Sequence, residues 1–173
     1  MDGYKQAEAI APNWRLQLGS LGFGNHFIEV SLDETDYLWL FLHSGSRGVG
    51  NKLAMKHIRV AQQQCDKRWI SLPDKDLAYL MEGEPEFWSY MEALRWAQRF
   101  AYLNREEMMH RVVACFEAWA GPIERVGEIN CHHNYTVREK KSLPRCGEAP
   151  LHPSGPRRAH GWDRVGPFRR VPR

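Results

Sequence analysis

The sequence lacks the features of a membrane or secreted protein. It contains no apolar run long enough to cross a bilayer, and no N-terminal signal peptide with a basic start and an apolar centre. The four cysteines lie far apart without a CxxC pair, so they predict neither a zinc ribbon nor a disulfide framework. The net charge of +3 is too small by itself to indicate nucleic-acid binding. We therefore expect no membrane association and a reducing, cytoplasmic setting.

The composition is that of a folded protein. Of the 173 residues, 43% are hydrophobic and 12% aromatic, which suits one domain or a piece of a larger one. Residues 21–48 hold two β-branched or aromatic runs around the turn sequence Asp33–Asp36. From about Asn51 to Gly121 apolar residues recur at helical spacing, and Asn104 and Arg105 suggest a break between two helices. We expect an α+β fold, with an antiparallel β-hairpin that belongs to a larger sheet, followed by a mainly helical section.

The last segment, residues 142–173, differs in composition from the rest. It holds six of the ten prolines and seven arginines against two acidic residues, and it has no helical or strand period. We expect this tail to be disordered, either as a basic arm that contacts RNA or DNA or as the product of an altered reading frame. The chain is thus divided into a domain at residues 1–141 and a tail at residues 142–173.

Two histidines lie near the ends of the predicted hairpin. Pairing of the strands around Glu34 and Thr35 would place His26 directly opposite His43. Directly opposed residues have Cβ atoms about 4.5–5.5 Å apart, which suits two imidazoles that bind one metal ion or two neighbouring ions. A single bulge would shift this register by one residue and turn one histidine away.

Both histidines have polar, glycine-rich neighbours. The glycines allow close backbone approach, as phosphate sites require, and two serines and Arg47 follow His43 directly or closely. A second histidine pair, His132–His133, occurs in the sequence EINCHHNYT. These contexts favour a metal site at His26, His43 and the His132–His133 pair, with no reaction assigned. The remaining histidines are expected to be ordinary core or surface residues: His57, His110, His152 and His160.

Three long blocks of sequence carry a family resemblance. The blocks LGSLGFGNHFIEV, LHSGSRGVGN and NCHHNY resemble motifs of RtcB-type RNA ligases, the tRNA-splicing and RNA-repair ligase family. DLAYLMEGE and WAQRFAYLNREEMM also resemble the helices between these motifs, particularly in bacterial members. The resemblance is continuous from about Leu16 to Lys141 and covers most of the chain.

The resemblance implies a GTP-dependent enzyme with two manganese ions and a guanylylated histidine. Such an enzyme joins RNA ending in a 3′-phosphate or 2′,3′-cyclic phosphate to RNA with a 5′-hydroxyl, so RNA is the implied partner, as tRNA halves or broken RNA. Carried over by motif, His26 is a ligand of one manganese ion, and His43 and His133 are ligands of the other. Arg47 matches a residue for contact with RNA or phosphate. The implied guanylate contacts are Asn25, His26, Phe27, Ile28, Glu29, His133 and Asn134.

Parts of the family pattern are not found in the sequence. The block with an aspartate and a bridging cysteine that bind manganese is expected before Met1, and the block with the guanylylated histidine beyond Lys141. No nucleophile is therefore assigned, since the surroundings of His160 do not match that motif. Three hypotheses remain: a ligase family member that is inactive alone, a non-catalytic metal- or guanylate-binding module that works with another chain, and a non-functional truncated product. The first is preferred.

Overall fold

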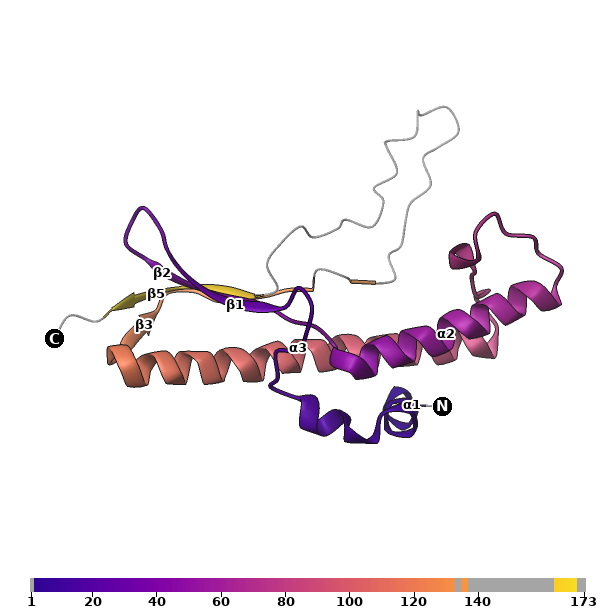
Figure 1. Cartoon of the computed structure of the whole chain (residues 1–173), viewed down its shortest axis with the longest axis horizontal. Coiled ribbons are helices and arrows are strands. Elements are labelled where there is room, and N and C mark those ends of the chain that lie inside the picture. The colour runs from indigo at the N-terminus through magenta and orange to yellow at the C-terminus, as the bar shows by residue number, and fades with distance from the viewer. Residues whose placement is uncertain (1, 133–134, 137–163, 171–173) are drawn as a thin grey trace, which may run out of the picture.

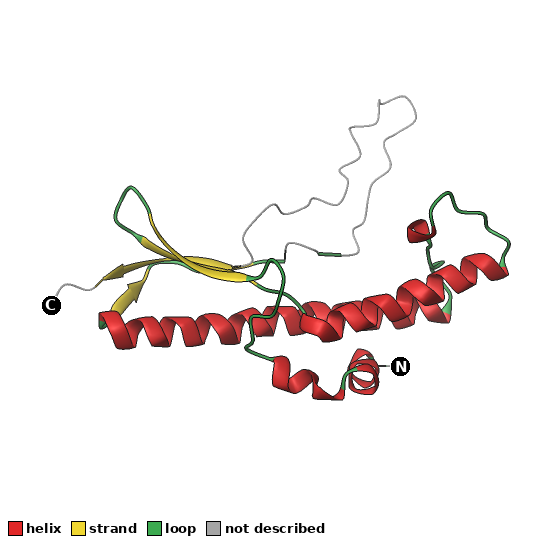
Figure 2. Cartoon of the chain, viewed as in Figure 1, coloured by secondary structure: helices red, strands yellow, loops and turns green. Residues whose placement is uncertain are grey.

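The computed structural model describes residues 2–132, 135–136 and 164–170. One long helix runs through the described part of the chain, with the β-sheet packed along one half of it and the other helices along the other half (Figures 1 and 2). The helices are α1 (Gly3–Ile10), η1 (Pro12–Gln17), α2 (Arg47–Lys67), η2 (Lys75–Leu77) and α3 (Pro85–Ala120). The strands are β1 (Phe27–Leu32), β2 (Leu38–His43), β3 (Ile123–Arg125), β4 (Ile129–Asn130) and β5 (Arg164–Arg170). The predicted α+β class with an antiparallel hairpin is confirmed.

The helical section contains one uninterrupted helix where a break was suggested. Helix α3 has 36 residues and is therefore about 54 Å long at a rise of about 1.5 Å per residue. Pro85 occupies its first turn, and Gly121, with a φ of 86°, ends it. The suggested break at Asn104 and Arg105 is wrong, because both side chains bond to groups outside the helix and leave its backbone intact.

The hairpin has a different register from the predicted one. His43 faces Phe27, and not His26, because the loop has three residues instead of two. The N–H of Asp33 donates to the carbonyl of Tyr37 (3.0 Å), and Asp36 has a φ of 62°. A three-residue hairpin loop ends in such a left-handed residue. A two-residue loop would instead require a positive φ at Glu34 or Thr35, and neither residue type tolerates that conformation well.

Asp33 organises this turn through its side chain. Its carboxylate accepts hydrogen bonds from the Trp39 indole (2.7 Å), from the hydroxyl and N–H of Thr35 (2.8 and 2.9 Å), and from the N–H of Tyr37 (2.9 Å). These bonds, that from Trp39 foremost, lower the pKa of Asp33 to about 2. The ionised carboxylate therefore stabilises the loop that sets the register.

Two apolar clusters pack against α3 at different positions. The helical cluster joins α1, α2 and the first half of α3 and consists of Ala7, Ala11, Val49, Leu53, Ala93 and Phe100. The sheet cluster joins β2 to the second half of α3 and consists of Leu40, Leu42, Met108, Met109 and Val113. Asn104 and Arg105 lie on α3 between the two clusters, so the segment between them is polar.

The sheet has the order β1-β2-β5-β3, with β4 also paired to β5. Strand β5 lies within residues 142–173, which were expected to be disordered; residues 137–163 and 171–173 lie outside the described residues. Strand β2 offers backbone hydrogen-bonding groups along its second edge, and β5 pairs with them. The predicted larger sheet is thus present.

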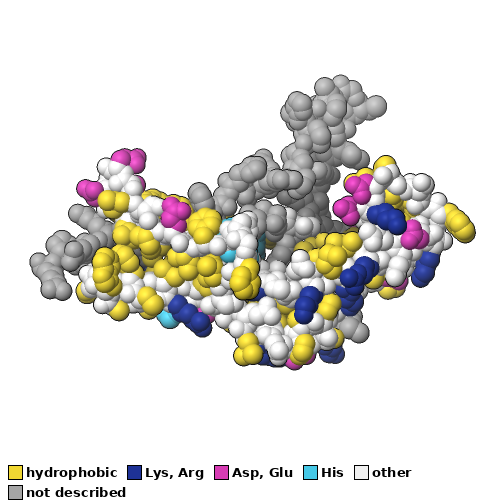
Figure 3. All heavy atoms as spheres, viewed as in Figure 1, with side chains coloured by type: hydrophobic (Ala, Val, Ile, Leu, Met, Phe, Trp, Pro, Cys, Tyr) yellow, Lys and Arg dark blue, Asp and Glu magenta, His cyan; other side chains and the backbone are white. Residues whose placement is uncertain are grey.

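Strand β1 forms the edge of this sheet and overhangs α3. Ile28, Val30 and Leu32 share a face with the β2 residues that pack on α3, yet they are 41%, 54% and 66% exposed. A groove of about 410 Å³ runs between this edge and the end of α3, past Phe116 and Trp119. Figure 3 shows hydrophobic side chains gathered over this side of the sheet. Among the helices described, none combines the length and apolar character of a transmembrane span.

Candidate functional site

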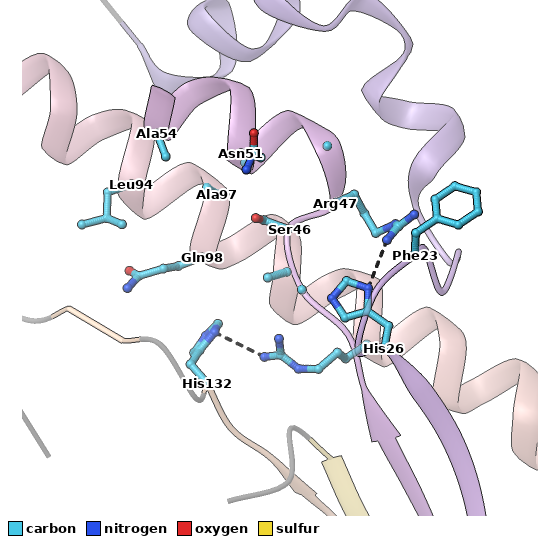
Figure 4. Close-up of a pocket in the computed structure, with 15 residues that line it drawn as sticks. Phe23, His26, Ser46, Arg47, Asn51, Ala54, Leu94, Ala97, Gln98 and His132 are labelled. Carbon is cyan, nitrogen blue, oxygen red and sulfur yellow. Dashed lines mark hydrogen bonds between the residues drawn. The ribbon is translucent and has the colours of Figure 1, made fainter. Parts of the chain in front are cut away.

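The motif-bearing loops meet at a hollow beside the base of the hairpin. Its volume is about 640 Å³, within the range of small-molecule sites, and its walls come from the start of α2, the middle of α3 and the ends of the hairpin (Figure 4). His26, Arg47, Arg105 and His132 all line it. Segments that are far apart in the sequence therefore present histidine and arginine side chains to one space.

His26, which lines the hollow, lies beside His43. Their ring centroids are 5.7 Å apart and the ring planes are inclined by 63°. The shift in register does not separate them, because His26 precedes β1 and is not constrained by the strand alternation. The side-chain amide nitrogen of Asn25 lies 3.3 Å from Nε2 of His43. The structure thus brings together the two histidines that the hairpin argument paired, by a different geometry.

Arg47 holds the loop that precedes His26. Its guanidinium donates to the carbonyl of Leu21 (2.8 Å) and to the hydroxyl of Ser20 (3.2 Å), and it lies 3.4 Å from Nδ1 of His26. Burial lowers the pKa of Arg47 from its ordinary value. Arg47 begins α2 with a φ of 59°, a conformation that non-glycine residues rarely adopt and that is often found at functional sites. A cation is thus fixed beside His26 at the start of a helix.

Asn104, which the sequence suggested only as part of a helix break, bonds to both loops that carry the histidines. It is fully buried, and its side-chain oxygen accepts from the N–H groups of Gly19 (2.8 Å) and Ser20 (3.3 Å). Its amide nitrogen donates to the hydroxyl of Ser44 (3.1 Å) and lies 3.4 Å from the carbonyl oxygen of Gly45. The polar pair in an otherwise apolar helical stripe was the available signal, and it was interpreted as a helix break.

Arg105 connects a second pair of segments. It is 1% exposed, and its Nε donates to the side-chain oxygen of Asn130 (2.8 Å). One terminal nitrogen donates to the carbonyl of Ser44 (3.4 Å), and the other lies 3.3 Å from Nδ1 of His132. The ring of His132 also stacks on that of Tyr135, at 5.4 Å and 12°. The segment that carries the His132–His133 pair is therefore tied to the segment that follows β2.

The other predicted residues are only partly gathered at the hollow. Phe27 lies beside His43, with ring centroids 5.7 Å apart. Ile28 takes the opposite face of β1, as strand alternation requires, while Glu29 is exposed and accepts a hydrogen bond from Ser31 (2.8 Å). Of the five-residue stretch from Asn25 to Glu29, His26 lines the hollow. His133 and Asn134 lie outside the described residues, and so do His152 and His160.

His57 and His110 lie away from this site. His57 is buried beside the helical cluster, where its Nε2 lies 3.0 Å from the side-chain oxygen of Gln6. Burial, with a smaller effect of Lys56, lowers the pKa of His57. His110 is exposed on α3. His57 therefore has a structural place as a neutral ring in the core.

His26 and His43 are two neighbouring side chains whose ring nitrogens could bind a metal ion. Two neighbouring imidazoles are suitable ligands for a first-row divalent ion. Across residues 2–132, 135–136 and 164–170, no group of three or more His, Cys, Asp and Glu side chains is arranged to hold a metal ion. Because a guanidinium only donates, Nδ1 of His26 accepts from Arg47, and the neutral ring carries its proton on Nε2. Binding of a metal by Nε2 would thus require the contact with Arg47 to be released.

Comparison with known proteins gives the family. The family model described as tRNA-splicing ligase RtcB matches residues 2–164. The chain belongs to the RtcB family. The resemblance found in the motifs is thereby confirmed, and the match runs past residue 141, where the sequence analysis placed the end of the domain.

Individual RtcB proteins match over most of this chain. The RNA-splicing ligase RtcB of Escherichia coli K12 is 47% identical over 129 residues, which cover 71% of this chain and 32% of that protein. The tRNA-splicing ligase RtcB of Pyrobaculum aerophilum is 30% identical over 141 residues, which cover 73% of this chain and 29% of that protein. The RNA-splicing ligase RtcB of Mycobacterium bovis is 30% identical over 135 residues, which cover 68% of this chain and 30% of that protein. The chain spans about a third of the length of these curated RtcB relatives.

Proposed function

We propose that this chain contributes a manganese- and guanylate-binding part of an RtcB-type RNA ligation site. The proposed reaction joins RNA ends that carry a 3′-phosphate or 2′,3′-cyclic phosphate to RNA ends with a 5′-hydroxyl, with GTP as the source of guanylate. The observation that supports it best is the distance of 5.7 Å between the ring centroids of His26 and His43, beside a hollow that His26 and Arg47 line. We further propose that the chain is inactive alone, since it spans about a third of its relatives and contains no assigned nucleophile.

The side chains at the hollow have distinct proposed tasks. His26 and His43 would hold manganese, which supplies charge neutralisation and orientation at a phosphate. Arg47 and the first backbone N–H groups of α2 present positive charge to phosphate oxygens of guanylate or RNA. Activation of an RNA 3′-phosphate with GMP gives it a good leaving group, so that attack by the 5′-hydroxyl forms a phosphodiester and releases GMP. The arrangement is therefore suited to nucleotidyl and phosphoryl transfer.

Manganese binding tests the proposed site directly. Free Mn²⁺ is measured by its electron paramagnetic resonance signal during titration of the chain and of the variants His26→Ala and His43→Ala. We expect each variant to bind at least tenfold more weakly than the unmodified chain, because each removes one of two adjacent ligands. His110→Ala is the matched control, because His110 is exposed on α3 away from the hollow, and it should bind as the unmodified chain does. Equal binding by all four proteins would contradict the proposal.

A ligation assay tests the proposed inactivity. The chain is incubated with GTP, Mn²⁺ and two RNA strands, one with a 2′,3′-cyclic phosphate and one with a 5′-hydroxyl. We expect no joined product from the chain alone, while a full-length RtcB ligase, such as that of Escherichia coli, serves as the positive control. Joined RNA in the sample with the chain alone would show that it contains its own nucleophile and would refute the inactivity.

A further inference from the structure

We propose that Asn104 and Arg105 are positioning residues, which together set the relative placement of the three loops that reach the hollow. The loops are residues 19–26, residues 43–47 and residues 130–132. This inference rests on the proposed function, since it concerns the placement of the His26 and His43 rings as metal ligands. It adds two residues of α3 that bond to the loops carrying the histidines, Asn104 from outside the lining of the hollow and Arg105 from within it.

Asn104 joins the first loop to the second. As an acceptor it binds two consecutive N–H groups, of Gly19 and Ser20, and as a donor it binds the Ser44 hydroxyl. The hydroxyl of Ser44, which is itself fully buried, donates in turn to the carbonyl of Leu21 (3.1 Å). One amide side chain and one hydroxyl thus tie the segment before His26 to the segment after His43.

Arg105 joins the second loop to the third. Its guanidinium reaches the carbonyl of Ser44, the side chain of Asn130 and the ring of His132. Asn130 also donates to the carboxylate of Glu106 (2.7 Å), so this loop is attached to α3 at two consecutive residues. A planar guanidinium addresses several acceptors in fixed directions, which an ammonium group cannot do.

The burial of both residues indicates a geometric role more than a stabilising one. A buried polar side chain costs free energy unless its hydrogen bonds are made, whereas an apolar residue at the same place would extend the neighbouring clusters. A fully bonded polar network fixes one arrangement of the groups that it joins. Because both residues lie on one rigid helix, the three loops are placed relative to a common frame.

The test compares four variants of the whole chain with the unmodified chain. Asn104→Leu removes the bonds between the first two loops, and Arg105→Lys keeps the charge but loses the planar fork. Gln63→Leu and Arg95→Lys are matched controls at exposed positions of α2 and α3. Three quantities are measured: the nuclear Overhauser effect (NOE) between the ring protons of His26 and His43, the ¹⁵N shift that reports which nitrogen of His132 is protonated, and the thermal midpoint.

We expect Asn104→Leu to abolish the NOE between the two rings and Arg105→Lys to change the ¹⁵N pattern of His132, while both controls keep the signals of the unmodified chain. Mn²⁺ should bind at least tenfold more weakly to Asn104→Leu than to Gln63→Leu. A merely structural role would shift the thermal midpoint and leave the folded variant's NOE intact. Should Asn104→Leu fail to fold, Ser44→Ala, which removes one acceptor of Asn104, takes its place.

The outcomes separate this inference from the proposed function. Unchanged NOE, ¹⁵N pattern and manganese affinity in folded variants would overturn the positioning role while leaving the metal site in place. An unmodified chain that shows the NOE but binds no Mn²⁺ would refute the proposed metal site, and loss of the NOE in Asn104→Leu would still support the positioning role. Absence of the NOE from the unmodified chain would overturn the inference outright.

Discussion

Replacement of Leu42 by alanine is expected to destabilise the chain far more than the same change at Leu32. Both residues lie on the face of the hairpin that is directed towards α3, but Leu42 is fully buried and Leu32 is 66% exposed. A buried leucine replaced by alanine costs about 2–5 kcal/mol. Full burial of a leucine is worth about 1.5–3 kcal/mol, of which Leu32 realises about a third, so its loss should cost about 0.5–1 kcal/mol.

Urea unfolding followed by far-UV circular dichroism measures this difference. With a slope of about 2 kcal/mol per M, in the middle of the usual range, Leu42→Ala should lower the unfolding midpoint by about 1–2.5 M and Leu32→Ala by about 0.25–0.5 M. The two variants are matched in chemistry, in strand type and in face. Equal shifts would refute the reasoning, because they would mean that the apolar side of β1 is covered in solution.

Three further predictions concern the turn, the core and the loop before His26. Asp33, with its pKa lowered to about 2, should stabilise the fold above pH 4, and this contribution should disappear as the pH falls towards 2, whereas Asp33→Ala should show no such loss in acid unfolding. Because burial lowers the pKa of His57, the stability of the fold should fall as the pH drops below about 6.5, the usual pKa of an unfolded histidine. In thermal melts, His57→Gln should weaken this dependence of the melting temperature on pH. Gly22→Ala and Gly24→Ala both place a side chain on a residue with a positive φ. At position 22 the new methyl group would also collide with the Arg47 guanidinium, whereas at position 24 it would meet open space. We therefore expect Gly22→Ala, and not Gly24→Ala, to shift the NMR signals of the His26 ring.

The sequence was sufficient for the hairpin and the family because those depend on local patterns. The alternating runs around residues 33–36 predicted the hairpin, and the long motif blocks led to the RtcB family. The register was wrong by one residue, since it depends on whether the turn contains two residues or three. The side chain of Asp33 and the left-handed conformation of Asp36 determine which loop forms. Pairing residues by their sequence numbers takes neither of these into account.

The site could be predicted only where motif residues carry it. His26, His43 and Arg47 were found because they lie in recognisable blocks, and in the structure His43 and Arg47 both lie next to His26. Asn104 and Arg105 were misinterpreted, because a polar pair in a helix gives the same local pattern whether it breaks the helix or binds distant loops. Their partners lie 25–85 residues away, a distance over which periodicity carries no information.

The polar segment of α3 between the helical cluster and the sheet cluster also has a consequence for dynamics. Apolar packing holds each half of the described structure to its own stretch of the helix, and between them the connection consists of directional hydrogen bonds. Packed clusters of this kind open as cooperative units, each with its own free energy of opening. The two halves should then exchange their amide hydrogens as separate groups. The hollow lies at the joint between these groups, because its walls come both from the start of α2 and from the ends of the hairpin.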